Sequence, residues 1–243
     1  MTQTVNNPFF QSYNTPFVTP PFNEIKTEHY EPAFDKGIIQ LEKEIQEIVE
    51  NKQPATFENT IVALERSGKL LEKVSSAFFN VLNAEADDEM MEISQRVSPK
   101  LSESSNNIFL NERLFARVKD VYEQKEQLNL STEDAKLLEE TFESFSVRGA
   151  NLSPEDKEKY RKLSTDLSIL TLTFDQNALK DKNRYELLLT EEKDLAGLPE
   201  SIREAATYRA KEKGKEGWLF NLSAPSYIPF MRYSALRPLR EAM

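Results

Sequence analysis

The chain has 243 residues, of which 41 are acidic and 31 basic, so its formal net charge is −10. This balance excludes a general nucleic-acid binder and a protein that docks on anionic lipid, because both need clustered Lys and Arg. With no Cys and a single His, His29, the chain has no disulfides, no thiolate nucleophile and no site built on two imidazoles.

The composition favours a mainly helical fold. Apolar residues make up only 39%, but 15 Phe and 8 Tyr provide enough apolar volume for a core. The 6 Gly and 12 Pro are too few for a loop-rich all-β protein. No signal-peptide pattern opens the chain, and no run of about 18 apolar residues occurs, so we expect a cytoplasmic protein that does not enter a membrane.

Residues 1–27 are expected to form an extended arm that packs on the helical body. Pro8, Pro16, Pro20 and Pro21 oppose helix formation in this stretch. The many aromatic side chains argue against a free tail. These are Phe9, Phe10, Tyr13, Phe17 and Phe22.

Residues 28–182 are expected to form the helical domain. Apolar residues recur at steps of three and four from about Glu31, and again after an N-cap at Thr56, with Gly68 interrupting the second stripe at a close helix contact. Further helices are predicted after Asp87, from Leu110 to Leu130 and after Ser131, the last one ending at Gly149. The stripes contain Phe34, Ile38, Leu41, Ile45, Ile48 and Val49; Ile61, Leu64, Leu71, Val74, Phe78 and Leu82; Met91, Val97, Leu101 and Ile108; Leu114, Phe115, Val118 and Val121; and Leu137, Leu138, Phe142 and Phe145.

The clearest helix start in the sequence is Ser153-Pro154-Glu155-Asp156. It combines an N-cap Ser, a Pro at the first helical position and acidic residues in the first turn. The helix that follows carries regularly spaced apolar side chains, and we expect its leucines and phenylalanine to be buried on one face. These residues are Tyr160, Leu163, Leu167, Leu170, Phe174 and Ala178.

Residues 183–243 are expected to form a small α+β segment. Alternation predicts a strand at 185–190, a helix follows from about Pro199 to Lys213, and a second strand at 218–222 pairs with the first. Pro225 and Pro229 are expected to interrupt the next stretch, before a helix-like ending at 231–243.

No catalytic, cofactor-binding or metal-binding residue can be assigned from the sequence. His29, beside Tyr30 and Glu31, is more typical of a helix start than of a catalytic base. The acidic pairs point about 100° apart on a helix and so indicate solvated faces. Ser67-Gly68-Lys69 lacks the other positions of a phosphate loop, and Met90-Met91 is typical of core filling. The pairs are Asp87/Asp88, Glu139/Glu140 and Glu191/Glu192; two glycosylation-type sequons begin at Asn129 and Asn221.

Several segments resemble a known family in the order in which they occur. The chain is similar to the thimet oligopeptidase/neurolysin-like zinc metallopeptidases, and most of all to their bacterial peptidyl-dipeptidase branch. The matching segments are NPFF at 7–10, TPF at 15–17, PFNEI at 21–25, HYEPAFDKG at 29–37, FENTIVALERSG at 57–68, LFARV at 114–118, LTFDQN at 172–177, LAGL at 195–198 and LRPLRE at 236–241.

The resemblance implies the N-terminal part of such an enzyme. It implies a neurolysin-like, multi-helix array that forms one wall of a channel admitting short unfolded peptides. The family's zinc is held by an HExxH helix and a downstream Glu in the C-terminal half, and this chain has no HExxH. We therefore expect zinc only in the full-length enzyme, and a chain that is inactive alone.

Two functions remain open at this stage. The first is the channel-wall part of a peptidase whose partner is the missing C-terminal catalytic half. The second is a non-catalytic helical scaffold or a peptide- or protein-binding module. Under the first, residues 231–243 are expected near the junction with the missing half, with five side chains less buried than their apolar character suggests. These are Tyr227, Phe230, Met231, Tyr233 and Leu236.

Overall fold

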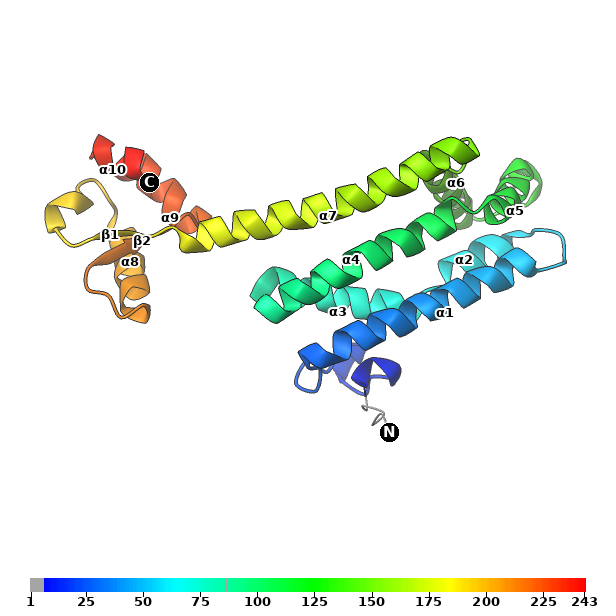
Figure 1. Ribbon diagram of the computed structural model, residues 1–243, viewed down its shortest axis with the longest axis horizontal. Coiled ribbons are helices and arrows are strands. Elements are labelled where there is room, and N and C mark those ends of the chain that lie inside the picture. Colours follow the sequence, from blue (N-terminus) through cyan, green and yellow to red (C-terminus); the bar gives the residue numbers. More distant parts are fainter. Residues whose placement is uncertain (1–6, 86) are drawn as a thin grey trace. The chain divides into compact units, whose positions relative to one another are not determined.

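The architecture is mainly helical, with one small antiparallel sheet near the C-terminus, as predicted. The computed structural model describes residues 7–85 and 87–243 (Figure 1). Its helices are α1 (Tyr30–Glu50), α2 (Ala63–Glu65), α3 (Lys69–Glu85), α4 (Asp88–Phe109), α5 (Glu112–Glu123), α6 (Thr132–Val147), α7 (Pro154–Arg184), α8 (Glu200–Glu212), α9 (Ala224–Tyr233) and α10 (Arg237–Ala242), and its strands are β1 (Leu187–Leu189) and β2 (Trp218–Phe220).

The chain divides into two compact units, Met1–Thr171 and Leu172–Met243. In the first unit, α1 packs against α3 and α4, and α5 packs against α6. Two apolar clusters form its core. One joins the C-terminal part of α1 to α5 and α6 around Leu114, Val118 and Phe145, and the other joins the start of α1 to α3 and α4 around Phe34 and Phe78.

Gly68 lies between two helices rather than inside one. Its φ of +73° is a left-handed conformation that glycine adopts without strain, and it separates α2 from α3. An added Cβ at Gly68 would lie 3.2 Å from Leu41 Cδ1 of α1, so a close contact is present there as expected. A closer backbone contact occurs at Gly37, where an added Cβ would lie 3.0 Å from the Leu71 Cα. Gly37 therefore allows α1 and α3 to approach closely.

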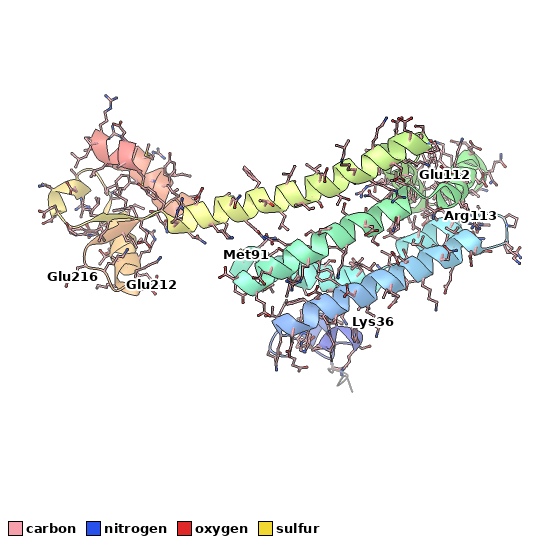
Figure 2. All side chains as sticks on the ribbon, viewed as in Figure 1. Lys36, Met91, Glu112, Arg113, Glu212 and Glu216 are labelled. Carbon is pink, nitrogen blue, oxygen red and sulfur yellow. The ribbon has the colours of Figure 1, made fainter. Side chains whose placement is uncertain are left out.

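The arm is held on the first unit mainly through Phe9. This side chain is buried, and its ring centroid lies 5.4 Å from that of Tyr30. Lys36, labelled in Figure 2, places its Nζ 3.9 Å from the Phe10 ring centroid. Phe17 is 97% exposed and has a φ of 58°, so this part of the arm does not pack on the body. Residues 1–6 of the predicted arm lie outside the described residues.

Helix α7 begins as predicted, but the prediction that its apolar face is buried was wrong. Ser153 Oγ accepts a hydrogen bond from the Asp156 amide at 3.2 Å, which is an N-cap interaction. The side chains buried on α7 are the polar Lys157 and Gln176. The apolar spacing identified the apolar side of the helix but not its burial, because burial also depends on a second element that covers this side. The exposed residues are Leu163, Leu167, Leu170 and Phe174.

The second unit is built around the pairing of β1 with β2. The two strands pair, as the sequence predicted, and the pairing is antiparallel, with Leu188 opposite Leu219. Its core contains side chains from the strands, α8 and α9, namely Leu189, Leu195, Leu198, Ala206, Phe220 and Phe230.

The prediction that prolines interrupt the stretch after β2 was wrong, because α9 includes both of them. Pro225 lies in the first turn, where helix amides have no intrahelical partner anyway. Pro229 lies inside the helix beside Phe230, which is fully buried. Phe230 was expected to be poorly buried, so that prediction was also wrong, whereas Tyr227, Met231 and Tyr233 are exposed as expected. Leu236 is half-buried.

Candidate functional site

His29 has a structural role at the start of α1. It is 5% exposed, and its Nδ1 accepts a hydrogen bond from the Lys26 amide at 2.9 Å. Its carbonyl oxygen accepts a bond from Asn7 Nδ2 at 2.7 Å, which ties the arm to the helix start. Because the imidazole is buried and already paired, it is not placed to act as a base on a substrate.

A second contact of the arm involves Lys73 of α3. Its Nζ donates hydrogen bonds to the carbonyls of Phe9 and Gln11 at 3.1 and 2.7 Å, and lies 3.6 Å from the Tyr13 ring centroid. Burial lowers the pKa of Lys73 and raises that of Tyr13 to about 12, where the nearby Tyr30 contributes as well. The group serves to anchor the arm, since the ammonium is occupied by backbone carbonyls.

The acidic pairs identified in the sequence do not form a metal site. Across the described residues, no group of three or more His, Cys, Asp or Glu side chains converges in a way that could hold a metal ion. Asp87 is instead the N-cap of α4, where its Oδ1 accepts a hydrogen bond from the Met90 amide at 2.7 Å. Glu139 forms an ion pair with Lys136 at 3.3 Å on the surface of α6.

The other sequence motifs also have local structural roles. The Gly68 amide donates a hydrogen bond to Glu44 Oε2 at 2.7 Å, which ties the turn between α2 and α3 to α1. Asn221 Oδ1 accepts hydrogen bonds from the amide and hydroxyl of Ser223, at 3.2 and 2.6 Å, which forms a turn after β2. Met90 is in the core and Met91 is half-buried.

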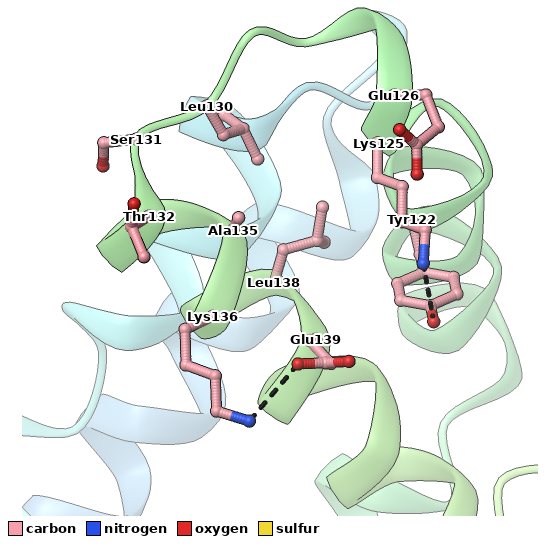
Figure 3. Close-up of a pocket in the computed structure, with 10 residues that line it drawn as sticks. All are labelled: Tyr122, Lys125, Glu126, Leu130, Ser131, Thr132, Ala135, Lys136, Leu138 and Glu139. Carbon is pink, nitrogen blue, oxygen red and sulfur yellow. Dashed lines mark hydrogen bonds and ion pairs between the residues drawn. The ribbon is translucent and has the colours of Figure 1, made fainter.

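A pocket of about 610 Å³ lies between α5 and the start of α6 (Figure 3). Its two lysines are both engaged: Lys125 Nζ lies 3.2 Å from the Tyr122 hydroxyl, and Lys136 pairs with Glu139. Those hydrogen bonds are the main reason why the pKa of each lysine is raised. Both side chains therefore stay protonated at neutral pH, so neither lysine can serve as a general base or an activated nucleophile.

Two shallower grooves follow α4. The groove beside α1 has a volume of about 400 Å³ and contains Asp35, Lys100 and Ser104, while the groove beside the start of α7 has about 370 Å³ and contains Arg161 and Asp166. Glu103 lines both. The Ser104 hydroxyl is buried without a hydrogen-bond partner. Both grooves are lined by charged side chains of both signs.

No sequence pattern indicated a role for Lys157, which is 7% exposed in α7. Its Nζ forms an ion pair at 2.9 Å with Glu112, labelled in Figure 2 at the start of α5. Residues 45 positions apart in sequence make this contact, so no local pattern could have identified it. It fixes the first turn of α7.

The relatives of the chain are peptidases by name. No protein-family model matches it. It is 37% identical over 241 residues to dipeptidyl carboxypeptidase of Escherichia coli, covering 99% of this chain and 35% of that protein. It is 31% identical over 229 residues to oligopeptidase A of the same organism, covering 94% of this chain and 34% of that protein.

The chain is a homologue of these peptidases. A more distant relative, named probable cytosolic oligopeptidase A of Arabidopsis thaliana, is 26% identical over 246 residues, covering 97% of this chain and 34% of that protein. The resemblance identified from the sequence is confirmed. The chain spans about a third of the length of the relatives it matches. No helix in the described part of the chain has the length and apolar character needed to cross a membrane.

Proposed function

We propose that this chain is the N-terminal, channel-wall part of a zinc-dependent peptidyl-dipeptidase or oligopeptidase that hydrolyses short unfolded peptides in the cytoplasm. The observation that carries the proposal is the 37% identity to dipeptidyl carboxypeptidase, which extends over 99% of the chain. Similarity of this extent, without large gaps in coverage, supports a shared fold and a shared place in a larger enzyme.

Zinc does not fit the residues of this chain. A catalytic zinc site usually has three protein ligands drawn from His, Cys and carboxylates, whereas this chain has one His, which is buried and paired, and no Cys. In an enzyme as long as the relatives, the metal and the water that it activates would therefore be held by the two thirds that this chain does not cover. This chain would contribute the shape of the channel and polar contacts to the peptide, and we expect it to be inactive alone.

Two assays test the proposal. The 243-residue chain, supplied with zinc, is expected to give no turnover of a quenched-fluorescent peptide. A chimaera, in which this chain replaces the matching segment of the E. coli dipeptidyl carboxypeptidase, is expected to cleave the same peptide and to lose activity with a chelator.

Turnover by the chain alone would contradict the assignment of catalysis to the remaining part. A folded chimaera without activity would favour the other candidate, a non-catalytic scaffold or binding module. The chimaera's fold is checked independently by circular dichroism and sedimentation.

A further inference from the structure

Helix α7 exposes an apolar stripe in the first unit, which we define as Leu163, Leu167 and Leu170. Their exposed fractions are 67%, 64% and 65%. At 100° per residue, the three side chains fall within an arc of about 60°. Their spacing of four and three residues is the spacing by which one helix packs along another.

On the other side of α7, polar side chains bond to residues of the first unit. Ser164 Oγ accepts a hydrogen bond from Asn106 Nδ2 at 2.8 Å, and Arg161 donates to Asn107 Oδ1 at 2.8 Å. Lys157 adds its ion pair with Glu112. A surface helix ordinarily buries its apolar side and exposes its polar side, so the orientation of α7 is the reverse of the usual one.

The stripe has fewer charges beside it than other exposed helix faces of this chain. Asp166 is the one charged residue among positions 163–174. By contrast, the exposed side of α1 carries the Lys43–Glu47 ion pair, and that of α6 carries Lys136 with Glu139 and Glu140. A contiguous exposed apolar surface with few charges is typical of an interaction site.

We propose that the stripe is the docking surface for an amphipathic helix from the remaining two thirds of a relative-sized peptidase, an inference that rests on the proposed function. The relatives are about three times as long as this chain, so a large part of such an enzyme lies outside the residues described here. The helix that fits would carry apolar side chains at matching three- and four-residue steps and no charge at its centre.

Cysteine labelling tests this docking directly, because the chain has no Cys of its own. Leu167→Cys is made in the 243-residue chain and in the chimaera with the E. coli enzyme. The rate of alkylation by iodoacetamide is read by mass spectrometry from the tryptic peptide that covers residues 163–180. This readout is independent of any cysteine in the rest of the chimaera and of its activity.

We expect alkylation of Leu167→Cys to be at least about tenfold slower in the chimaera than in the chain alone. The matched control is Ile39→Cys on α1, a position 66% exposed, which is expected to react at the same rate in both. A second set of variants carries the labelled cysteine at a third stripe position, Leu163→Cys, in the chimaera. Adding Leu167→Glu and Leu170→Glu to this variant should restore fast labelling of the cysteine. Adding Ile39→Glu, the control, should not.

Equal labelling of Leu167→Cys in both proteins would overturn the docking surface, even if the chimaera is active. If alkylation of Leu167→Cys in the chain alone became slower as the protein concentration rose, the stripe would be covered by a second copy of the chain. That result would also overturn the proposal. An inactive chimaera in which the stripe is protected would refute the proposed activity but not the docking.

Discussion

Two leucines of this chain show that helical spacing and burial are separate properties of a residue. Leu138 and Leu167 both lie on the apolar side of a helix, as their spacing predicted. Leu138 is 1% exposed in the core around α5 and α6, whereas Leu167 is 64% exposed on α7. Hydrophobic stabilisation depends on the area removed from water, so these two side chains contribute very differently to the folded chain.

Leu138→Ala is expected to lower the free energy of unfolding by about 2–5 kcal/mol, the usual cost of such a change in a core. Leu167→Ala, made at an exposed position, is expected to change it by no more than about 0.5 kcal/mol. Urea unfolding followed by circular dichroism measures both. A loss above about 2 kcal/mol for Leu167→Ala would mean that the stripe is covered within this chain.

Glu186 makes the second unit sensitive to acid. Its carboxylate accepts hydrogen bonds from Lys213, at 2.6 Å, and from Lys215, and these bonds lower its pKa from the ordinary 4.5 to about 2. A carboxylate with a lowered pKa stabilises the folded state above its unfolded pKa, and that contribution is lost as the pH falls through the folded pKa.

Glu186→Gln should therefore make the second unit less stable than the wild type at pH 7, and the difference should shrink as the pH is lowered from about 4.5 to about 2. Urea unfolding followed by the fluorescence of Trp218, the single Trp, measures this. Glu216→Gln removes an exposed charge from the same unit and serves as the control. A difference that stays constant with pH would refute the role of Glu186.

At the scale of the elements, helix starts were predictable because an N-cap is a local interaction. Thr56 Oγ accepts a bond from the Asn59 amide at 3.1 Å, and Ser131 Oγ accepts one from the Asp134 amide at 3.1 Å. The burial of α7 was not predictable, because it depends on which element covers the apolar side. Pro229 was misjudged as a helix break, since a proline inside a helix can kink it without ending it.

The β1–β2 pair contains a glycine that the strand geometry requires. Gly217 has a φ of +108°, and an added Cβ would lie 2.3 Å from the Leu189 carbonyl oxygen. Gly214 also has a positive φ, +65°, but an added Cβ there would meet nothing within 4 Å. An alanine at Gly214 would therefore show only the free-energy cost of the positive φ, whereas an alanine at Gly217 would add the cost of a steric clash.

Gly214→Ala is expected to destabilise the second unit by about 1 kcal/mol, the scale of the left-handed conformation for a residue with a Cβ. Gly217→Ala should cost several times more, because the backbone of the strand pair must shift. Trp218 fluorescence during urea unfolding reports both. Equal effects would contradict the close approach of Gly217 to Leu189.

At the scale of the whole molecule, each unit has its own core. The sequence predicted a mainly α fold with an α+β segment at its C-terminal end, because both follow from local periodicity. It predicted no catalytic site, and the structure gives the prominent candidates, His29, Asp87 and Gly68, roles in helix ends and turns. Contacts between distant residues, such as Lys157 with Glu112, could not be predicted, because no repeating pattern links their positions.

Because each unit has its own core, a core substitution is expected to lower mainly the stability of the unit that contains it. Phe230 is fully buried, and its ring centroid is 4.7 Å from that of Phe220. Phe230→Ala is expected to lower the stability reported by Trp218 by about 3–5 kcal/mol. The circular dichroism of the large helical unit should change little, and Leu138→Ala should give the opposite pattern. Identical shifts of both probes by both variants would show that the chain unfolds as one cooperative unit.

The polar contacts along the first half of α7 have a consequence for exchange with solvent. A hydrogen bond such as Asn106 to Ser164 can be replaced by bonds to water at little net cost, whereas an apolar contact such as Phe34 with Phe78 cannot. Residues 154–171 of α7 should therefore open more often than α1, and their amide protons should be replaced by deuterium sooner. The helix with the strongest start signal in the sequence is then among the first to admit solvent to its backbone.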